Sequence, residues 1–337
     1  MVPPRPRAEP TLEPPARLSS IAPPLRQVGA ACCVGLAWDR DDVLWGAEIG
    51  DRVGVSFGIG VGRYDVQGRE LERPQTDIVA ERVKSAPDGR LYLLEPGWLP
   101  VLERMDTGGG RAGRVPLPRA RYSELDLQDV AAAPDGTLWL VDDRRLEVHH
   151  LAASGEHLGH WSVAAALVNP QGGGAHRVAV SPEGASIYVL KRNRVLRYAP
   201  DGRLLAAWGA QQLELGPDDF RSLQDLAVDG AGRVYILEVT GRIHVFEPDG
   251  WRVATWMAFD CPVGDDHGYP VSLALGPEGQ VAVADAAAGR IHLYAPLGSP
   301  PAPPQRGPFR AHLPYGARPE GGGCGPAEAS GVLEIGR

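Results

Sequence analysis

Residues 226–250 read LAVDGAGRVYILEVTGRIHVFEPDG and contain two short runs typical of β-strands, Arg233–Leu237 and Arg242–Phe246. Both runs are rich in β-branched and aromatic residues, and the Gly, Asp and Pro residues around them favour turns. Nothing in the stretch resembles a loop that binds a cofactor. Its meaning depends on whether it recurs, because a repeat of about 20 to 50 residues determines the architecture of a chain.

The stretch recurs, so that the chain contains six repeats. The equivalent turns begin at Asp41, Asp88, Asp135, Glu183, Ala231 and Glu278, so successive turns are 47 or 48 residues apart. The residues after each turn align without gaps as VLWGAE, RLYLLE, TLWLVD, SIYVLK, RVYILE and QVAVAD. A third run follows in most repeats, and a fourth ends in Trp161, Trp208 and Trp256. Each repeat therefore predicts four strands.

Four strands at this period, with a tight turn between the first two, are typical of one blade of a β-propeller. The first strand of each repeat alternates larger and small residues, as in Leu226-Ala227-Val228, and small residues allow the inner strands to crowd around an axis. The repeats occupy residues 29–312. The sequence thus predicts an all-β fold, a six-bladed β-propeller of four-stranded antiparallel blades.

The two ends of the chain differ from the repeats. Residues 1–28 form a Pro-rich N-terminal arm, and residues 313–337, which include GGGCG, predict a flexible C-terminal tail. The sixth repeat has the Pro-rich segment 299–308 in place of its outer strand, and proline cannot donate to a sheet ladder. We therefore expect a piece of residues 17–29 to close the sixth blade, which would also remove an exposed sheet edge.

Residues 208–250 resemble an NHL repeat through their WG pair and their D-L-A-V-D, G-R-V-Y and R-I-x-V-F landmarks. The other repeats keep the strand pattern and match these landmarks less completely. The resemblance implies the propeller fold. It does not select a function, because NHL propellers include RNA binders, protein scaffolds, lyases and parts of phage-tail-like particles.

Composition narrows the choice of partner and compartment. The chain has 34 basic and 42 acidic residues and a net charge of −8, which disfavours a nucleic-acid partner. The start lacks the apolar core of a signal peptide, and there is no apolar run of about 18 residues to span a membrane. We expect a cytoplasmic protein that binds neither nucleic acid nor a membrane.

A more distant resemblance, to gluconolactonase and regucalcin propellers, raises the question of an enzyme site. That family binds a divalent metal through Glu, Asn and Asp at the start of inner strands, and these positions fall in this chain on Val34, His176 and Gln224. Hard cations need several oxygen ligands, and no carboxylate remains among the three. The sequence predicts no metal site, no catalytic set and no cofactor.

Shifted by one residue, the same positions form a ring of polar and small residues: Gly35, Arg82, Asp129, Arg177, Asp225 and Ser272. One interpretation is a polar funnel that grips a ligand or a partner's side chains, with Gln128, His176 and Gln224 as further contacts. The other is an ion-pair collar that joins neighbouring inner strands. The collar is favoured, because charges held close together near an axis pair with each other.

Other polar residues suggest sites less strongly. The segment CPVGDDHGYP places Asp265, Asp266, His267 and Tyr269 in the loop before the sixth repeat, on the same face as the channel mouth. This is either a solvated polar loop or a metal or acid–base site, and no motif supplies further ligands. The Gly-rich residues 58–65 are expected to belong to an enlarged loop of the first repeat.

Repeated polar residues on the second and third strands have simpler interpretations. His149, His244 and His292 are expected on blade surfaces. The acidic residues that end the second strands, such as Asp142, are expected to tie a hairpin through a following arginine, such as Arg145, at about 0 to 1 kcal/mol each.

These patterns favour a non-enzymatic, NHL-like propeller that acts as a protein-binding scaffold. One version is a component of a larger assembly such as a phage-tail-like particle. The alternative is a propeller-type hydrolase or lyase, lactonase-like or NHL-lyase-like, with a site at the channel mouth. No G-x-S-x-G, H-E-x-x-H or P-loop motif supports it. Both interpretations are compatible with a small-molecule ligand in the central channel.

Overall fold

The computed structural model describes residues 12, 15, 17–21, 30–52, 55–97, 99–106, 108–117, 125–163, 177–191, 193–209, 222–258, 269–286 and 289–298. All of them lie in one compact unit, Met1–Ala302. They form antiparallel sheets and no helix, which confirms the predicted all-β, six-bladed β-propeller. The predicted C-terminal tail, 313–337, lies outside the described residues.

The first three blades each begin with an inner strand and continue outward to the rim. Blade one contains β2 (Ala30–Trp38), β3 (Leu44–Arg52) and β4 (Val55–Tyr64). Blade two contains β5 (Arg82–Ser85), β6 (Leu91–Glu95), β7 (Val101–Met105) and β8 (Arg111–Val115). Blade three contains β9 (Leu127–Ala132), β10 (Leu138–Asp142), β11 (Glu147–Leu151) and β12 (His157–Ser162).

The other three blades follow the same order. Blade four contains β13 (Arg177–Val180), β14 (Ile187–Lys191), β15 (Arg194–Tyr198) and β16 (Leu204–Gly209). Blade five contains β17 (Leu223–Val228), β18 (Val234–Glu238), β19 (Arg242–Phe246) and β20 (Arg252–Met257). Blade six contains β21 (Pro270–Leu275), β22 (Val281–Asp285), β23 (Arg290–Tyr294) and, outermost, β1 (Arg17–Ile21).

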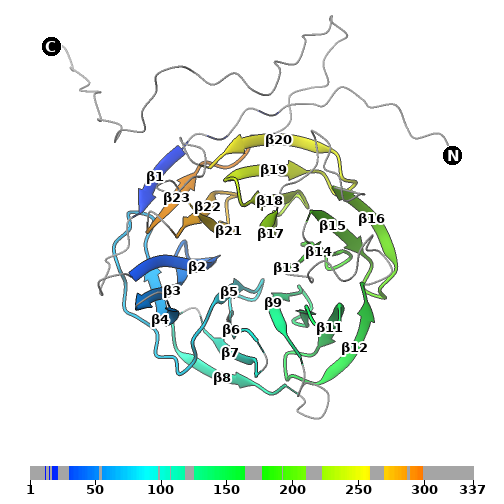
Figure 1. Cartoon of the computed structure of the whole chain (residues 1–337), viewed down its shortest axis with the longest axis horizontal. Coiled ribbons are helices and arrows are strands. Elements are labelled where there is room, and N and C mark those ends of the chain that lie inside the picture. Colours follow the sequence, from blue (N-terminus) through cyan, green and yellow to red (C-terminus); the bar gives the residue numbers. More distant parts are fainter. Residues whose placement is uncertain are drawn as a thin grey trace, which may run out of the picture. The chain divides into compact units, whose positions relative to one another are not determined.

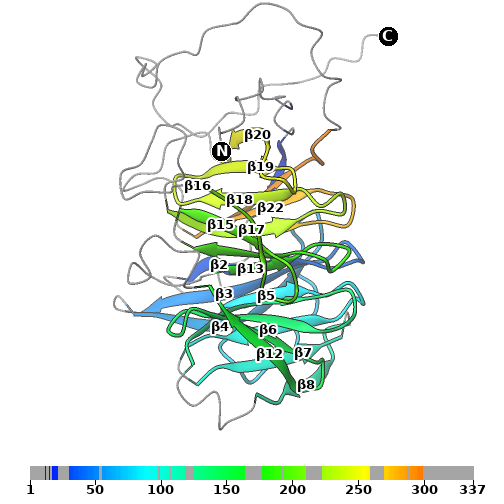
Figure 2. The ribbon, with the colours of Figure 1, turned by 90° about the vertical axis from the view of Figure 1, so that its right-hand side faces the viewer.

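The blades surround a central axis (Figure 1). The inner strands β2, β5, β9, β13, β17 and β21 neighbour one another in this cyclic order, so the ring is closed. Seen from the side, the strands run across the ring from one face to the other (Figure 2). One end of the channel is therefore lined by the turns that join each inner strand to the second strand, and we call this end the turn face.

The ring closes where the sequence predicted. β1 pairs antiparallel with β23, so a segment from the N-terminal arm supplies the outer strand of blade six. Leu12 extends the contact, because its N–H donates to the carbonyl of Val253 in blade five at 2.7 Å and its side chain is buried in the core there. Part of the arm therefore belongs to the propeller itself.

Blade one departs from the predicted pattern of four strands. Its fourth strand is reduced to an isolated bridge between Tyr64 and Glu70, beside a 2.9 Å hydrogen bond from Leu71 N–H to the carbonyl of Arg63. Pro74 follows closely and has no N–H with which to extend the ladder. The prediction of a loop at residues 58–65 was wrong, since most of this segment belongs to β4.

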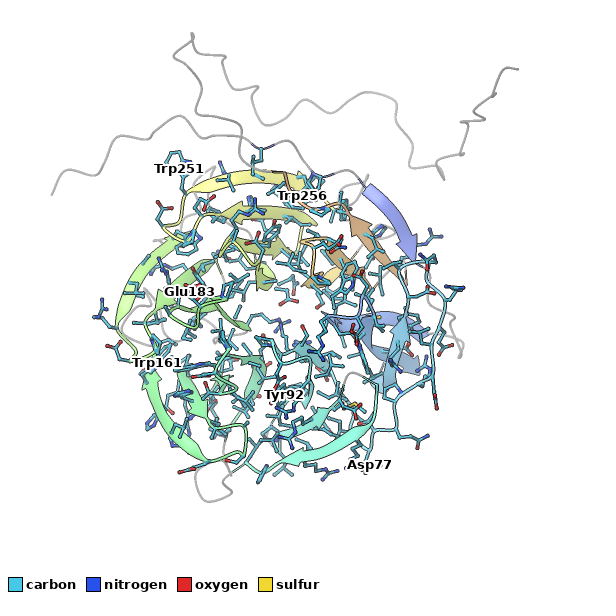
Figure 3. The ribbon with its side chains drawn as sticks, turned by 180° about the vertical axis from the view of Figure 1, so that it is seen from behind. Asp77, Tyr92, Trp161, Glu183, Trp251 and Trp256 are labelled. Carbon is cyan, nitrogen blue, oxygen red and sulfur yellow. The ribbon has the colours of Figure 1, made fainter. Side chains whose placement is uncertain are left out.

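A glycine–tryptophan contact at the rim joins blade three to blade four and blade four to blade five. The turn between the third and fourth strands of blade four contains Gly202, at φ +84°, and a Cβ there would lie 2.6 Å from Cγ of Trp161 in blade three. Gly250 of blade five meets Trp208 of blade four in the same way, at 3.2 Å. Trp161 is seen near the outside of the ring in Figure 3. Trp161 and Trp208 thus each pack beneath a glycine of the next blade.

This contact predicts that Gly202→Ala destabilises the protein more than Gly136→Ala does. Gly136 has nearly the same backbone, φ +83° and a turn hydrogen bond of 2.9 Å, but a Cβ there meets nothing within 4 Å. Gly136→Ala should cost only the left-handed strain, about 1 kcal/mol. Gly202→Ala should cost about 1–3 kcal/mol more through overpacking against Trp161. Denaturant unfolding measures both, and equal losses would contradict the contact.

Candidate functional site

Six equivalent positions on the inner strands form a ring around the axis, which we call the axial collar. In each blade the collar residue pairs with the fifth residue of the aligned six-letter segment, as Asp129 pairs with Val141 and Asp225 with Leu237. The members are Gly35, Arg82, Asp129, Arg177, Asp225 and Ser272. The structure therefore brings together the ring that the shifted alignment proposed.

Polar contacts of the collar cross every junction between blades. Three are hydrogen bonds to the backbone of the neighbouring blade: Val178 N–H to Asp129 at 3.1 Å, Leu273 N–H to Asp225 at 2.9 Å, and Leu36 N–H to the Ser272 hydroxyl at 3.0 Å. A fourth runs from Arg82 to the carbonyl of Val34 at 3.1 Å. Two ion pairs cross the remaining junctions: Arg177 with Asp225 at 3.5 Å, and Lys84 with Asp129 at 3.3 Å.

Asp225 is the most heavily engaged member of the collar. It is only 2% exposed, and it accepts hydrogen bonds from the Ser272 hydroxyl at 2.8 Å and from Leu226 and Leu273 N–H at 2.9 Å each. Burial alone would raise the pKa of Asp225, but the charges of Lys84 and Arg177 hold it below its ordinary value. Asp225 is thus an ionised structural anchor at neutral pH.

The surroundings of Arg82 disfavour its charged form, whereas those of Asp225 favour the charged form. Burial and the charge of nearby Arg177 lower the pKa of Arg82 to about 10, although Asp129 and Asp225 act to raise it. Its guanidinium is held by the carbonyls of Val34 and Glu81, at 3.1 and 2.9 Å.

Lys84 belongs to the site although the sequence pattern did not single it out. It lies two residues beyond Arg82 on β5, and its Nζ is 3.3 Å from Asp129 and 3.7 Å from Asp225. The signal was present in the alignment, because the other five blades have alanine at this place: Ala37, Ala131, Ala179, Ala227 and Ala274. A lysine among five alanines marks the residue that breaks the repeat.

Of the other candidate residues, the structure describes Gln128, Gln224 and Tyr269. Gln128 donates to Asp126 at 2.7 Å, and Gln224 lies half-buried beside the collar. The Tyr269 side chain is exposed, whereas its N–H donates to Asp285 at 2.8 Å. Four candidates lie outside the described residues: His176, Asp265, Asp266 and His267.

The expectation that three third-strand histidines lie on blade surfaces was wrong. All three are buried, and each has its Nε2 close to the acid that ends the second strand of its own blade. The pairs are His149 with Asp142 at 3.9 Å, His244 with Glu238 at 3.4 Å, and His292 with Asp285 at 3.7 Å. The acids are buried as well, so these pairs belong to the blade interior.

Blade one solves the same packing problem with a tyrosine. The position that holds histidine in blades three, five and six is Gly62 in blade one, and it pairs with Gly46 on the neighbouring strand. A Cβ at Gly62 would collide with both Glu48 and Tyr64, so the glycine leaves the space that the tyrosine fills. The Tyr64 hydroxyl donates to Glu48, which also accepts from Arg73 at 2.8 Å. Burial raises the pKa of Tyr64 and keeps it neutral.

The described residues show neither a metal-binding cluster nor a membrane-spanning helix. No group of His, Cys, Asp or Glu in this part of the chain is arranged to hold a metal ion. In the same residues no helix has the length and apolar character needed to cross a membrane.

Comparisons with known proteins show what the chain is similar to. No protein-family model and no curated protein matches it, so the NHL relationship stays a prediction. Among solved structures, a streptogramin B lyase is 14% identical with a TM-score of 0.54, covering 82% of this chain and 96% of its own. Virginiamycin B lyase from Staphylococcus aureus is 11% identical with a TM-score of 0.53, covering 82% and 84%.

A third similar structure has no assigned function. It is a protein from Bacteroides thetaiotaomicron, 14% identical with a TM-score of 0.61, covering 86% of this chain and 75% of its own. At these identities the comparisons establish the shared propeller fold.

The collar predicts a pH-dependent loss of stability in Asp225→Asn. At pH 7 the variant should lose about 3–5 kcal/mol, because Lys84 and Arg177 lose a buried counter-charge. The pKa of Asp225 is lowered by folding from an unfolded value of about 3.9, so the carboxylate stabilises fully above about pH 4. This contribution disappears as the pH falls through the folded pKa.

Urea unfolding between pH 7 and pH 3 measures the effect. The gap between wild type and Asp225→Asn should stay constant near neutrality and narrow below about pH 4. The exposed Glu183→Gln serves as the control and should change little throughout. A gap that persists unchanged at pH 3 would show that the carboxylate charge is not what stabilises the collar.

Proposed function

We propose that this chain is a non-enzymatic β-propeller that acts as a protein-binding scaffold. The observation that carries the proposal is the use of the collar carboxylates. Asp129 and Asp225 are the acids of the axial collar, one residue beyond the positions at which the metal-binding propellers place their ligands, and both accept backbone N–H groups of the next blade. A carboxylate that accepts an N–H group from the next blade acts as an anchor for the ring.

The rim supplies a surface for a protein partner. Large apolar side chains are exposed on the outer strands of three successive blades: Leu158 on β12 (49%), Leu204 and Leu205 on β16 (43% and 37%), and Met257 on β20 (41%). Outer strands also present a sheet edge, which partners recognise by strand addition. One form of this function is a place in a larger assembly such as a phage-tail-like particle.

The alternative is a propeller-type hydrolase or lyase. Its support is the likeness to structures named streptogramin B lyase and virginiamycin B lyase, at 14% and 11% identity. A common fold hosts many chemistries, so the likeness favours this alternative only if the channel mouth carries a catalytic set. The collar residues described above are engaged between blades, which favours the scaffold.

Sedimentation of the native protein tests the scaffold. In extracts of cells that make the chain, we expect it to sediment in complexes well above its own 36.0 kDa. Leu204→Ser together with Leu205→Ser should shift it toward the monomer, because the exposed apolar contact is lost. Glu156→Ser, an exposed change in the turn that precedes β12, is the matched control and should leave the complexes intact.

Two results would contradict the scaffold. Wild type that sediments as a free 36.0 kDa monomer has no stable partner. Turnover of a lactone or a cyclic depsipeptide by the purified protein, abolished in Asp129→Asn with the fold retained, would establish the enzyme instead.

A further inference from the structure

The channel changes character just inside the axial collar. The next inward position of each blade pairs with the aromatic position of the second strand, as Ala227 pairs with Tyr235 and Lys84 with Tyr92. Five blades place an alanine there, and blade two places Lys84. Alanine leaves the axis open because its side chain is short. The lysine is therefore the long polar side chain at this level of the channel.

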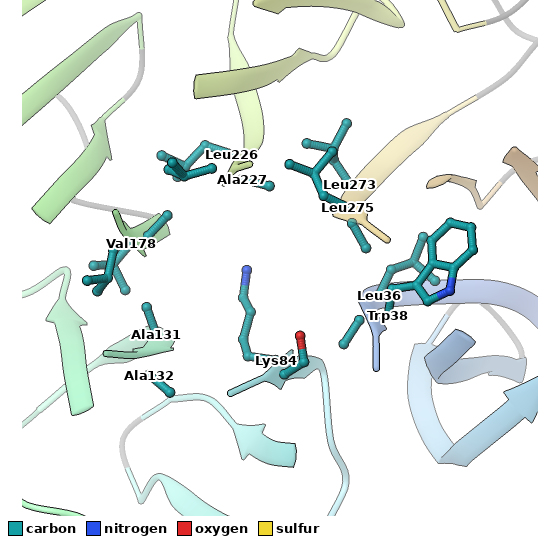
Figure 4. Close-up of a pocket in the computed structure, with 16 residues that line it drawn as sticks. Leu36, Trp38, Lys84, Ala131, Ala132, Val178, Leu226, Ala227, Leu273 and Leu275 are labelled. Carbon is teal, nitrogen blue, oxygen red and sulfur yellow. The ribbon is translucent and has the colours of Figure 1, made fainter. Parts of the chain in front are cut away.

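A cavity of about 160 Å³ surrounds this lysine. Most of the side chains that line it are apolar, Val178, Leu226 and Leu273 among them, while backbone atoms and the polar side chains Lys84 and Ser85 also contribute to its walls. Figure 4 shows Lys84 extending from β5 into the space between the inner strands, toward the side where Leu226 and Ala227 lie. An apolar cavity of roughly 150 Å³ is large enough to hold a ring the size of benzene.

A wider cavity of about 320 Å³ continues to the turn face. The two share six lining residues, so one continuous passage leads from the turns to the lysine: Trp38, Ser85, Ala132, Val180, Val228 and Leu275. Exposed prolines of four turns stand at its rim: Pro87, Pro134, Pro182 and Pro277. A site that is mainly apolar, with one well-placed polar group, is the usual form of a small-molecule pocket.

The acids at the turn face do not oppose entry of an anion strongly. Asp39 accepts hydrogen bonds from Val43 N–H at 3.0 Å and from the Trp45 ring N–H at 2.7 Å. Asp229 forms an ion pair with Arg233 at 2.7 Å. Both carboxylates are committed to their own turns.

The charge balance at the inner end is positive. Arg82, Lys84 and Arg177 face two buried carboxylates, Asp129 and Asp225, which leaves one positive charge in excess among these five groups, and the further acid near Arg82 is Glu81, which is exposed to solvent. The distances from Lys84 Nζ to the two acids, 3.3 and 3.7 Å, are longer than the roughly 2.7–2.9 Å of a strong charge-assisted hydrogen bond. An ammonium held this loosely can still donate to an oxygen that arrives from the channel.

We propose that the channel binds a small amphiphilic carboxylate, with an apolar body and one anionic head. The body lies between the inner strands, and the head accepts a hydrogen bond from the Lys84 ammonium. Entry is from the turn face, past Trp38 and the four prolines. This site lies in the channel and does not involve the rim. Its test is therefore independent of the sedimentation test of the scaffold.

Titration calorimetry with three probes tests the proposal on the wild-type protein. Sodium octanoate has both an apolar chain and a carboxylate, octan-1-ol has the chain without the charge, and acetate has the charge without the chain. Octanoate should bind about tenfold or more tightly than octan-1-ol, the gain from one hydrogen bond to a charged group. Acetate should bind far more weakly than either. Octanoate should also raise the melting temperature by mass action.

Two substitutions separate the head from the body. Lys84→Met should remove the preference of octanoate over octan-1-ol while the alcohol still binds. Ala227→Leu, which fills the cavity and keeps the lysine, should remove binding of both. Circular dichroism checks that each variant is folded.

A labelling experiment keeps the test decisive even if a variant fails to fold. The chain contains only two lysines, Lys84 and Lys191, so lysine labelled with ¹³C at Cε gives two side-chain signals. Octanoate should shift one of them, and Lys191, which is buried in β14, should stay unchanged. Equal affinity for octanoate and octan-1-ol, no binding of either, or an unmoved pair of lysine signals would each overturn the proposal.

Discussion

The buried ion pairs and hydrogen bonds of the axial collar are the contacts on which the ring depends. Six inner strands must meet around one axis, and each contributes one residue to the axial collar. A polar contact crosses each junction between blades at this level. Two examples are the hydrogen bond from Arg82 to the carbonyl of Val34 and the one from Leu273 N–H to Asp225. Buried charges are costly unless they are paired and hydrogen-bonded. The collar meets that condition by alternating arginine with aspartate in four consecutive blades.

This arrangement fixes the composition of the channel below it. With the charged groups engaged at the collar, the next level can be narrow and apolar, and five of its six residues are alanine. Lys84 is the exception, and its ammonium reaches back toward Asp129 and Asp225 from a passage lined mostly by apolar side chains. The same lysine thus contributes to ring closure and gives the channel its polar group. Function at this level comes from a departure from the repeat, because the repeat itself serves the fold.

Different blades can use different side chains at equivalent positions, provided that the same space in the blade is filled. Three blades fill the region beside the second-strand acid with a histidine, and blade one fills it with Tyr64 by placing glycine at both Gly46 and Gly62. At the rim, tryptophan and glycine combine in a similar way, as Trp161 and Gly202 show. In each case a large side chain is possible because a glycine on a neighbouring segment has none.

The sequence by itself determined the number of blades, the order of strands within them, and the segment that closes the ring. These features follow from local patterns, namely the 47-residue period, alternation along strands, and prolines that exclude an outer strand at residues 299–308. It also indicated the right collar positions once the register moved by one residue. It misjudged blade one, because glycine-rich residues 58–65 read as a loop and form a strand when the Tyr64 ring packs over them.

Only the tertiary structure decided which charges meet and which polar groups are buried. Lys84 lies 45 residues from Asp129 and 141 from Asp225 along the chain, and closure of the ring is what brings the three together. The burial of His149, His244 and His292 likewise depends on packing between strands and between blades. A pattern along one strand shows which way a side chain points, and the partner it meets there is set by the other five blades.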